Sequence, residues 1–280
     1  MRNEYHQLGR YQIQLGAISI TNIGIPSDYC IERGTDPKHV VGDTQVVCCS
    51  HQPNYLPWLG LFHKVAQSDI FVVHDEVLYS KGGLTNRNSI KGPNGPVLLT
   101  VPVRHGSSSL PIAEVLINND HNWRRKHVGS IEACYRRAPY FDDYWPSLRA
   151  IYDADWELMA ELNLSLISLL LVILQIHVQI VRGTELGVTG QKTERLINTC
   201  KAVGATSYVS GRGAANAYLD IALMMANRID VTVDSFEQPA YPQLWGDFLP
   251  NMSAIDVVFN IGPRVAEYMH DSLARSRIGS

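Results

Sequence analysis

Two short apolar runs, residues 46–49 and 70–73, each end in a cluster of polar residues, at positions 51–53 and 74–76. Apolar runs of this length, bounded by turn-forming residues, are typical of buried strands. In a parallel sheet, the polar side chains just past the strand ends line the binding crevice. The pattern therefore predicts that the two polar clusters lie close together and form a candidate site.

Strand-like and helical segments alternate along the rest of the chain, which favours an α/β fold: a mixed, largely parallel sheet with flanking helices. The turn at residues 92–96 joins two extended segments, as in a hairpin. Gly211, Arg212 and Gly213 predict a tight loop after a strand. Apolar spacing predicts helices at residues 57–66, 123–135, 155–174, 194–202, 218–227 and 254–259 and strands at 178–181, 207–210 and 231–233.

The first 44 residues differ from the rest of the chain, because they are rich in glycine and contain no long helical period. Residues 11–15 and 17–20 alternate between apolar and polar positions, as a short hairpin or edge strand does. We therefore predict an N-terminal extension at 1–44, an N-terminal α/β half at 45–152 and a C-terminal α/β half at 153–280.

Composition narrows the class of protein. With a net charge of −3 over 280 residues, the chain lacks the basic surface of a nucleic-acid binder. The apolar stretch 164–174 is shorter than the ~20 residues that span a bilayer, so it predicts a buried core helix and no membrane insertion. The first residues show no secretory signal, and the five cysteines form no CxxC pair, so we expect a cytoplasmic protein without a zinc or disulfide framework.

The first polar cluster offers candidates for acid–base chemistry. His51 is a candidate general base, since the reference pKa of histidine lies near neutrality, and Gln52 is a candidate substrate-binding amide. Cys49 stands two residues before this histidine and is a candidate nucleophile for thioester or acyl transfer. The alternatives are a histidine that caps a strand end and a cysteine buried in the core.

The second cluster adds carboxylates. Asp75 and Glu76 are adjacent and point to opposite faces if they lie on a strand. One can then orient a histidine or hold a substrate amine while the other is structural. Asp75 is a candidate catalytic residue, and His74 and Glu76 are candidate substrate-binding residues. The sequence His-Asp-Glu is not a specific metal signature, so we assign no metal site.

Further candidates for ligand binding lie in loops. Lys81, Arg87 and Asn88 surround a glycine break, and arginine and asparagine supply the donors that carboxylates and phosphates bind. The alternative is a solvated loop whose asparagines close their own turns. Arg212, between two glycines, is a candidate for binding an anion.

The order of these segments resembles the WbqC-like protein family over about residues 46–270. The resemblance implies that Gln52, Asp75, Arg87 and Asn88 form a shared apparatus and adds Tyr55 as a candidate substrate-binding residue. It implies a biosynthetic role in surface-polysaccharide, amino-sugar or natural-product pathways. The motifs are residues 51–60 (HQPNYLPWLG), 75–77 (DEV), 86–88 (NRN), 99–103 (LTVPV), 138–141 (APYF), 192–196 (KTERL), 204–211 (GATSYVSG), 241–243 (YPQ) and 250–256 (PNMSAID).

From the residue types and this family context, we predict a transferase that forms an amide bond. An acyl or aminoacyl group moves from a thioester, on a carrier protein or coenzyme A, to an amino sugar or similar small amine. Thioester aminolysis is favourable, so the prediction requires no cofactor. Two other classes stay open: a non-catalytic binding or scaffold protein of a biosynthetic complex, and a metal-dependent hydrolase.

Overall fold

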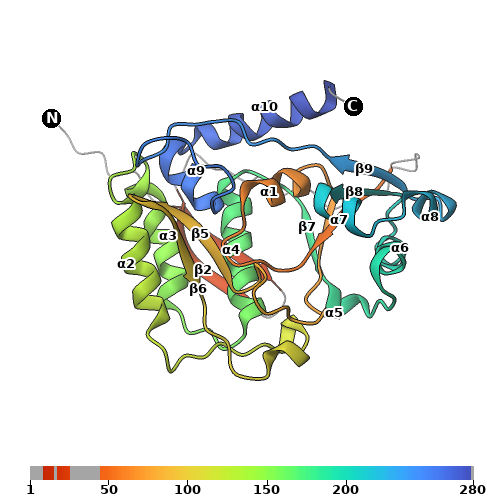
Figure 1. Ribbon diagram of the computed structural model, residues 1–280, viewed down its shortest axis with the longest axis horizontal. Coiled ribbons are helices and arrows are strands. Elements are labelled where there is room, and N and C mark those ends of the chain that lie inside the picture. The colour runs from red at the N-terminus through yellow and green to blue at the C-terminus, as the bar shows by residue number, and fades with distance from the viewer. Residues whose placement is uncertain (1–8, 16–17, 26–44, 279–280) are drawn as a thin grey trace.

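The computed structural model describes residues 9–15, 18–25 and 45–278, and a five-stranded parallel sheet lies in the right-hand half of the view in Figure 1. Its strand order is β7-β4-β3-β8-β9. The strands are β3 (Val47–His51), β4 (Ile70–Val73), β7 (Gln179–Arg182), β8 (Ser207–Gly211) and β9 (Asp230–Asp234). The sheet therefore combines strands from both sides of residue 152.

The order of the strands fixes where a crevice forms. The chain starts at the central strand β3, adds β4 and β7 toward one edge, and then returns to add β8 and β9 on the other side. Connections that leave neighbouring strands in opposite directions open a crevice beyond their carboxyl ends. In this sheet the switch falls between β3 and β8, at the end of the strand that contains His51.

Alternation along β3 divides the core into two layers. Cys48 packs on one face of the sheet in a cluster that includes Leu196 and Met224, whereas Cys49 packs on the other face in the main core. Successive side chains of a strand point to opposite faces, so one strand supports both layers. Because both faces are covered, β3 consists of small and apolar residues until it reaches the crevice.

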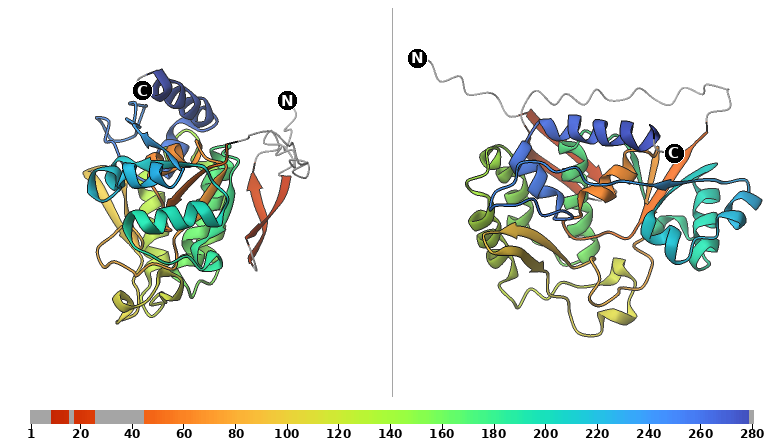
Figure 2. Two further views of the ribbon diagram at one scale, coloured as in Figure 1. Left: turned by 90° about the vertical axis from the view of Figure 1, so that its right-hand side faces the viewer. Right: turned by 45° about the horizontal axis from the view of Figure 1, so that its top comes forward.

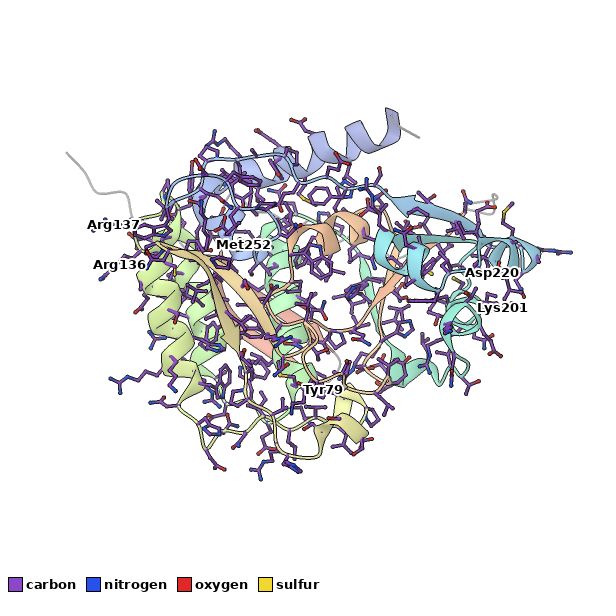
Figure 3. The ribbon with its side chains drawn as sticks, viewed as in Figure 1. Tyr79, Arg136, Arg137, Lys201, Asp220 and Met252 are labelled. Carbon is purple, nitrogen blue, oxygen red and sulfur yellow. The ribbon has the colours of Figure 1, made fainter. Side chains whose placement is uncertain are left out.

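Two groups of helices lie at opposite ends of the molecule (Figures 1 and 2). Figure 1 shows α2 and α3 at the end opposite α6 and α8, with α4 between the two groups, and α10 runs along the top, beside α1 and α9. Asp220 accepts from the N–H of Leu223 and caps α8 at the far end of the sheet (Figure 3).

The remaining helices and hairpins complete the fold. The helices are α1 (Leu59–Val65), α2 (Trp123–Tyr135), α3 (Phe141–Asp153), α4 (Met159–Ile173), α5 (Gly183–Leu186), α6 (Lys192–Ala202), α7 (Arg212–Ala217), α8 (Ile221–Ala226), α9 (Ala254–Ile261) and α10 (Arg264–Ile278), with 3-10 turns η1 (Ser107–Ser109) and η2 (Ile112–Glu114). The antiparallel hairpins are β1 (Gly9–Leu15) with β2 (Ile18–Ile25) and β5 (Arg87–Gly92) with β6 (Gly95–Thr100).

The structure confirms the α/β class, the largely parallel sheet and both hairpins. The predicted loop at Gly211–Gly213 is wrong, because Arg212 and Gly213 form the first turn of α7. The predicted helix at 155–174 begins only at Met159, since Asp155 forms an ion pair with Arg124 instead of capping it. Residues 26–44 lie outside the described residues, and the division into two halves stays a prediction.

The apolar stretch at 164–174 is buried almost throughout, and α4 is a core helix as predicted. Over the described residues, no helix combines the length and the apolar character that crossing a bilayer requires.

Candidate functional site

A cavity of about 690 Å³ opens at the crevice between β3 and β8. This volume lies within the range of small-molecule sites, roughly 300–1,000 Å³. Its walls come from the carboxyl ends of β3, β4, β8 and β9 and from the helices α1, α6 and α7. The polar and aromatic side chains of the wall include His51, Gln52, Trp58, Lys64, His74, Lys192, Arg195, Arg212, Asp234 and Phe236.

His51 lines this cavity, and only one of its two ring nitrogens, Nδ1, forms a hydrogen bond among the described residues. Its Nδ1–H donates to the carbonyl oxygen of Gln52 at 2.9 Å, so Nε2 has the lone pair. Burial, and to a smaller extent the nearby Lys64 and His74, lower the pKa of His51 from 6.5 to about 3. The imidazole is therefore neutral at physiological pH, with a fixed tautomer.

His74 is held by a carboxylate behind it. Its Nδ1–H donates to Oε1 of Glu76 at 2.8 Å, and Nη1 of Arg195 donates to the same oxygen at 2.8 Å. Burial opposes ionisation of Glu76, but hydrogen bonds from His74 and Arg195 outweigh it, and its pKa is lowered. This chain of contacts ties the end of β4 to α6. Nε2 of His74 is buried, and it has no hydrogen-bond partner among the described residues.

Glycine at position 183 makes room for this carboxylate. A Cβ atom there would lie 1.8 Å from Oε2 of Glu76, so a larger residue would displace the carboxylate from the end of β4. The sequence places Gly183 directly after β7, next to β4, the strand that His74 follows.

Lys64 brings a buried ammonium to the cavity wall. Only 5% of the residue is exposed, and Nζ donates to the carbonyl oxygen of Ser50 at 2.8 Å. Burial lowers its pKa, and the nearby Cys49 and Asp234 act in the opposite direction. Along α1, Lys64 lies one turn after Gly60 and Leu61, which also line the cavity.

The opposite part of the wall is built on Asp234, the last residue of β9. Its Oδ1 accepts from Nδ1 of His63 at 2.8 Å and from Nε2 of Gln67 at 3.2 Å. The ring of Phe236 stacks on His63, with 4.5 Å between the ring centroids. These contacts fix the side of the cavity that faces α1.

Four of the residues that the sequence predicts for the site line the cavity: His51, Gln52, His74 and Arg212. Glu76 is not a wall residue but holds His74 from behind. Asp75 is fully buried and engaged elsewhere: it accepts from Arg182 at 2.6 Å and from the backbone N–H of Thr184 at 3.0 Å.

Five other candidates do not line this cavity. Cys49 is fully buried in the core, and burial raises the pKa of its thiol. Asn88 donates to the carbonyl oxygen of Leu56 at 2.6 Å, and Arg87 donates to that of Gly82. The remaining two are Lys81, which is exposed, and Tyr55, which is buried in hydrogen bonds with His127 and Tyr152.

Sequence reasoning missed several wall residues, among them Lys64, Lys192, Arg195 and Asp234. A signal for Lys64 exists, because it is a charged residue on the buried face of a short apolar helix. Arg195 has no comparable signal, since arginine on an amphipathic helix usually faces solvent. Within the part of the chain that the structure describes, no three His, Cys, Asp or Glu side chains converge as a metal site.

Comparison with known proteins places this geometry in a family. The model of the WbqC-like protein family matches residues 52–268. The chain belongs to the WbqC-like family. A relative from Mycobacterium tuberculosis, "Uncharacterized protein Rv1507c", is 34% identical over 221 residues, which cover 78% of this chain and 95% of the relative. No solved structure matches the chain. The resemblance inferred from the sequence motifs is confirmed.

Proposed function

We propose that this WbqC-like protein is a transferase that forms an amide between an acyl or aminoacyl thioester and a small amine, in a biosynthetic pathway. The observation that carries the proposal is the neutral His51, whose bare Nε2 lies at the wall of a small-molecule cavity at the sheet's switch point. The function requires a base at the reacting amine, a donor for the developing oxyanion and a site that limits access of water.

The proposed reaction balances without a cofactor. The amine nitrogen attacks the thioester carbon, and the oxygen that becomes negative accepts from the side-chain amide of Gln52. Nε2 of His51 takes a proton from the nitrogen. As the C–S bond breaks, that proton passes to the sulfur, so that the products are an amide and a thiol. Cys49 takes no part in this route, which agrees with its burial and raised thiol pKa.

His74, Glu76 and Arg195 are positioning residues in this proposal. The shared oxygen of Glu76 fixes His74 beside His51, and His74 contributes to the lowered pKa of His51. In this proposal the two hydrogen bonds to Glu76, from His74 and from Arg195, keep the cavity wall in one arrangement when the substrates bind.

Amine-dependent release of thiol tests the proposal. Acyl and aminoacyl thioesters of coenzyme A and of a carrier protein are incubated with amino sugars, and the free thiol is measured. We expect wild type and the surface control Lys126→Met to release thiol, and His51→Ala to lose at least about 100-fold in rate, the usual contribution of a general base. If His51→Ala still binds the amine but releases thiol as fast as wild type, this assignment fails. If wild type binds both substrates and never turns over, the scaffold alternative takes its place.

A further inference from the structure

Lys64 is a buried cation without a carboxylate partner. Nζ has one acceptor, the carbonyl oxygen of Ser50, and no carboxylate oxygen of the described residues lies within 4.0 Å of it. An ammonium group taken out of water is stable only when it is paired or fully hydrogen-bonded. Two of its three N–H donors therefore remain for a group that enters the cavity.

Further positive charges line the cavity. Lys192 and Arg212 lie on its wall at the starts of α6 and α7. The nearby carboxylates already have partners: Asp234 on the wall accepts from His63 and Gln67, Glu76 accepts from His74 and Arg195, and the exposed Glu237 lies 3.5 Å from Arg212. The lining thus attracts negative charge, although the whole chain has a net charge of −3.

We propose that the cavity binds a phosphate-bearing substrate, with a phosphate or diphosphate group against Nζ of Lys64 and with Lys192 and Arg212 on its outer side. This inference rests on the proposed function and names the substrate class of the same site. A diphosphate belongs both to a nucleoside diphosphate linked to an amino sugar and to a coenzyme A thioester, so the acceptor and the donor are its two sources.

A phosphate at this position also couples binding to catalysis. Burial is the main cause of the lowered pKa of His51; Lys64 and His74 lower it further, and the carbonyl oxygen of Gln52 raises it. With a pKa of about 3, the imidazole of the free protein is a weak base. A bound phosphate offsets the charge of Lys64 and raises the pKa of His51 toward the range in which a histidine accepts protons efficiently.

Calorimetric titration of the full chain with pyrophosphate, uridine diphosphate and coenzyme A tests the inference, with uridine as the neutral control. Lys64→Met keeps the volume of the side chain and removes the charge, and Lys126→Met removes one positive charge from exposed surface on α2. Circular dichroism and thermal melting establish that each variant is folded. Lys192→Ala, at an exposed position on the wall, is a second variant that tests the site without disturbing the core.

We expect pyrophosphate to bind wild type and Lys126→Met equally, and to bind Lys64→Met at least about tenfold more weakly. Lys192→Ala weakens binding to a smaller extent. Tighter binding of uridine diphosphate than of coenzyme A assigns the site to the acceptor, and the reverse order assigns it to the donor. The inference is overturned if no phosphate compound binds wild type, or if Lys64→Met and Lys192→Ala bind all three as wild type does.

These titrations need no turnover, so they separate this inference from the proposed function. Binding that depends on Lys64, without any amide product, leaves the phosphate site standing and removes the transferase. If Lys64→Met forms amide as wild type does and pyrophosphate does not bind, the transferase stands and the phosphate site is removed.

Discussion

At the scale of single residues, the site depends on a balance of charge around His51. Lys64 approaches it from α1, and His74 approaches it from the end of β4; both lower its pKa. The carbonyl oxygen of Gln52 acts in the opposite direction and fixes the tautomer. Burial is the largest cause of the lowered pKa of His51, and these neighbours adjust that pKa further.

Lys64→Met is expected to raise the pKa of His51, because it removes a positive charge that disfavours the imidazolium. Nuclear magnetic resonance of the ring nitrogens, followed as the pH is lowered from 8, measures the change. The imidazole of the variant protonates at a higher pH than that of wild type, and the control Lys126→Met behaves as wild type does. A pKa that is the same in all three proteins would contradict the role given to Lys64.

The sequence indicates part of this arrangement. His51, Gln52 and His74 follow directly from two apolar runs that end in polar clusters, and the structure places all three at one cavity. The sequence also led to the hypothesis that one of the two adjacent carboxylates orients a histidine. Glu76 is in that position, since it accepts a hydrogen bond from His74. Sequence reasoning did not identify Lys64, because its burial results from the packing of α1 against the rest of the fold. A local sequence pattern does not contain that information.

At the scale of elements, ion pairs and hydrogen bonds hold the strand ends that surround the cavity. Asp75 joins the end of β4 to the start of α5, through Arg182 and the N–H of Thr184. Arg182 in turn donates to Glu161 on α4 at 2.7 Å. The carboxylate of Asp75 thus fixes the backbone just behind His74 and Glu76.

Asp75→Asn is expected to destabilise the protein by about 1–3 kcal/mol, because a buried carboxylate with several donors is lost. Urea unfolding measures this difference, and Asp153→Asn, which loses an exposed ion pair with Arg149, is the matched control with a change below about 0.5 kcal/mol. If Asp75→Asn is as stable as wild type yet loses turnover, Asp75 acts on the substrate, as the sequence pattern suggests.

Element boundaries show the limits of a local pattern. The apolar runs locate β3 and β4, since a buried parallel strand needs them. Gly211, Arg212 and Gly213 suggested a loop, because glycine is unfavourable within a helix. In the fold Gly211 ends β8, and Arg212 and Gly213 begin the short helix α7, which lies beside β8 and β9.

At the scale of the whole molecule, buried histidines make stability depend on pH. Burial lowers the pKa of His127 from 6.5 to about 4, and that of His51 to about 3. In the unfolded chain both protonate near 6.5, whereas in the folded chain they stay neutral. The unfolded state therefore binds more protons below this pH, and stability falls as the pH falls from about 6.5 toward 4 and 3. Asp256, whose pKa burial raises, acts in the opposite direction.

The urea midpoint is thus expected to fall between pH 7 and pH 5 by less in His127→Gln than in wild type, since the variant lacks one of these groups. His127 lies in the core between Tyr55 and Thr100, outside the cavity, so the comparison leaves the site intact. An equal fall in the two proteins would contradict the assignment of a neutral, buried His127.

The fold class could be predicted from the sequence, but the strand order could not. Alternating strands and helices indicate an α/β protein with a largely parallel sheet, as the structure confirms. Which strands become neighbours depends on contacts between segments far apart in the sequence, such as Val47 of β3 with Ser207 of β8. The crevice between those two strands is therefore a property of the assembled sheet.

The most direct test of the account is the intact mass of the protein and of the reaction products after a single turnover with thioester donor and amine. Direct transfer to the amine predicts amide from wild type and Cys49→Ala, no acyl adduct on either protein, and amide formed at least about 100-fold more slowly by His51→Ala. An acyl adduct on wild type that disappears in Cys49→Ala would contradict it, because the acyl group would then pass through the buried thiol and not directly to the amine.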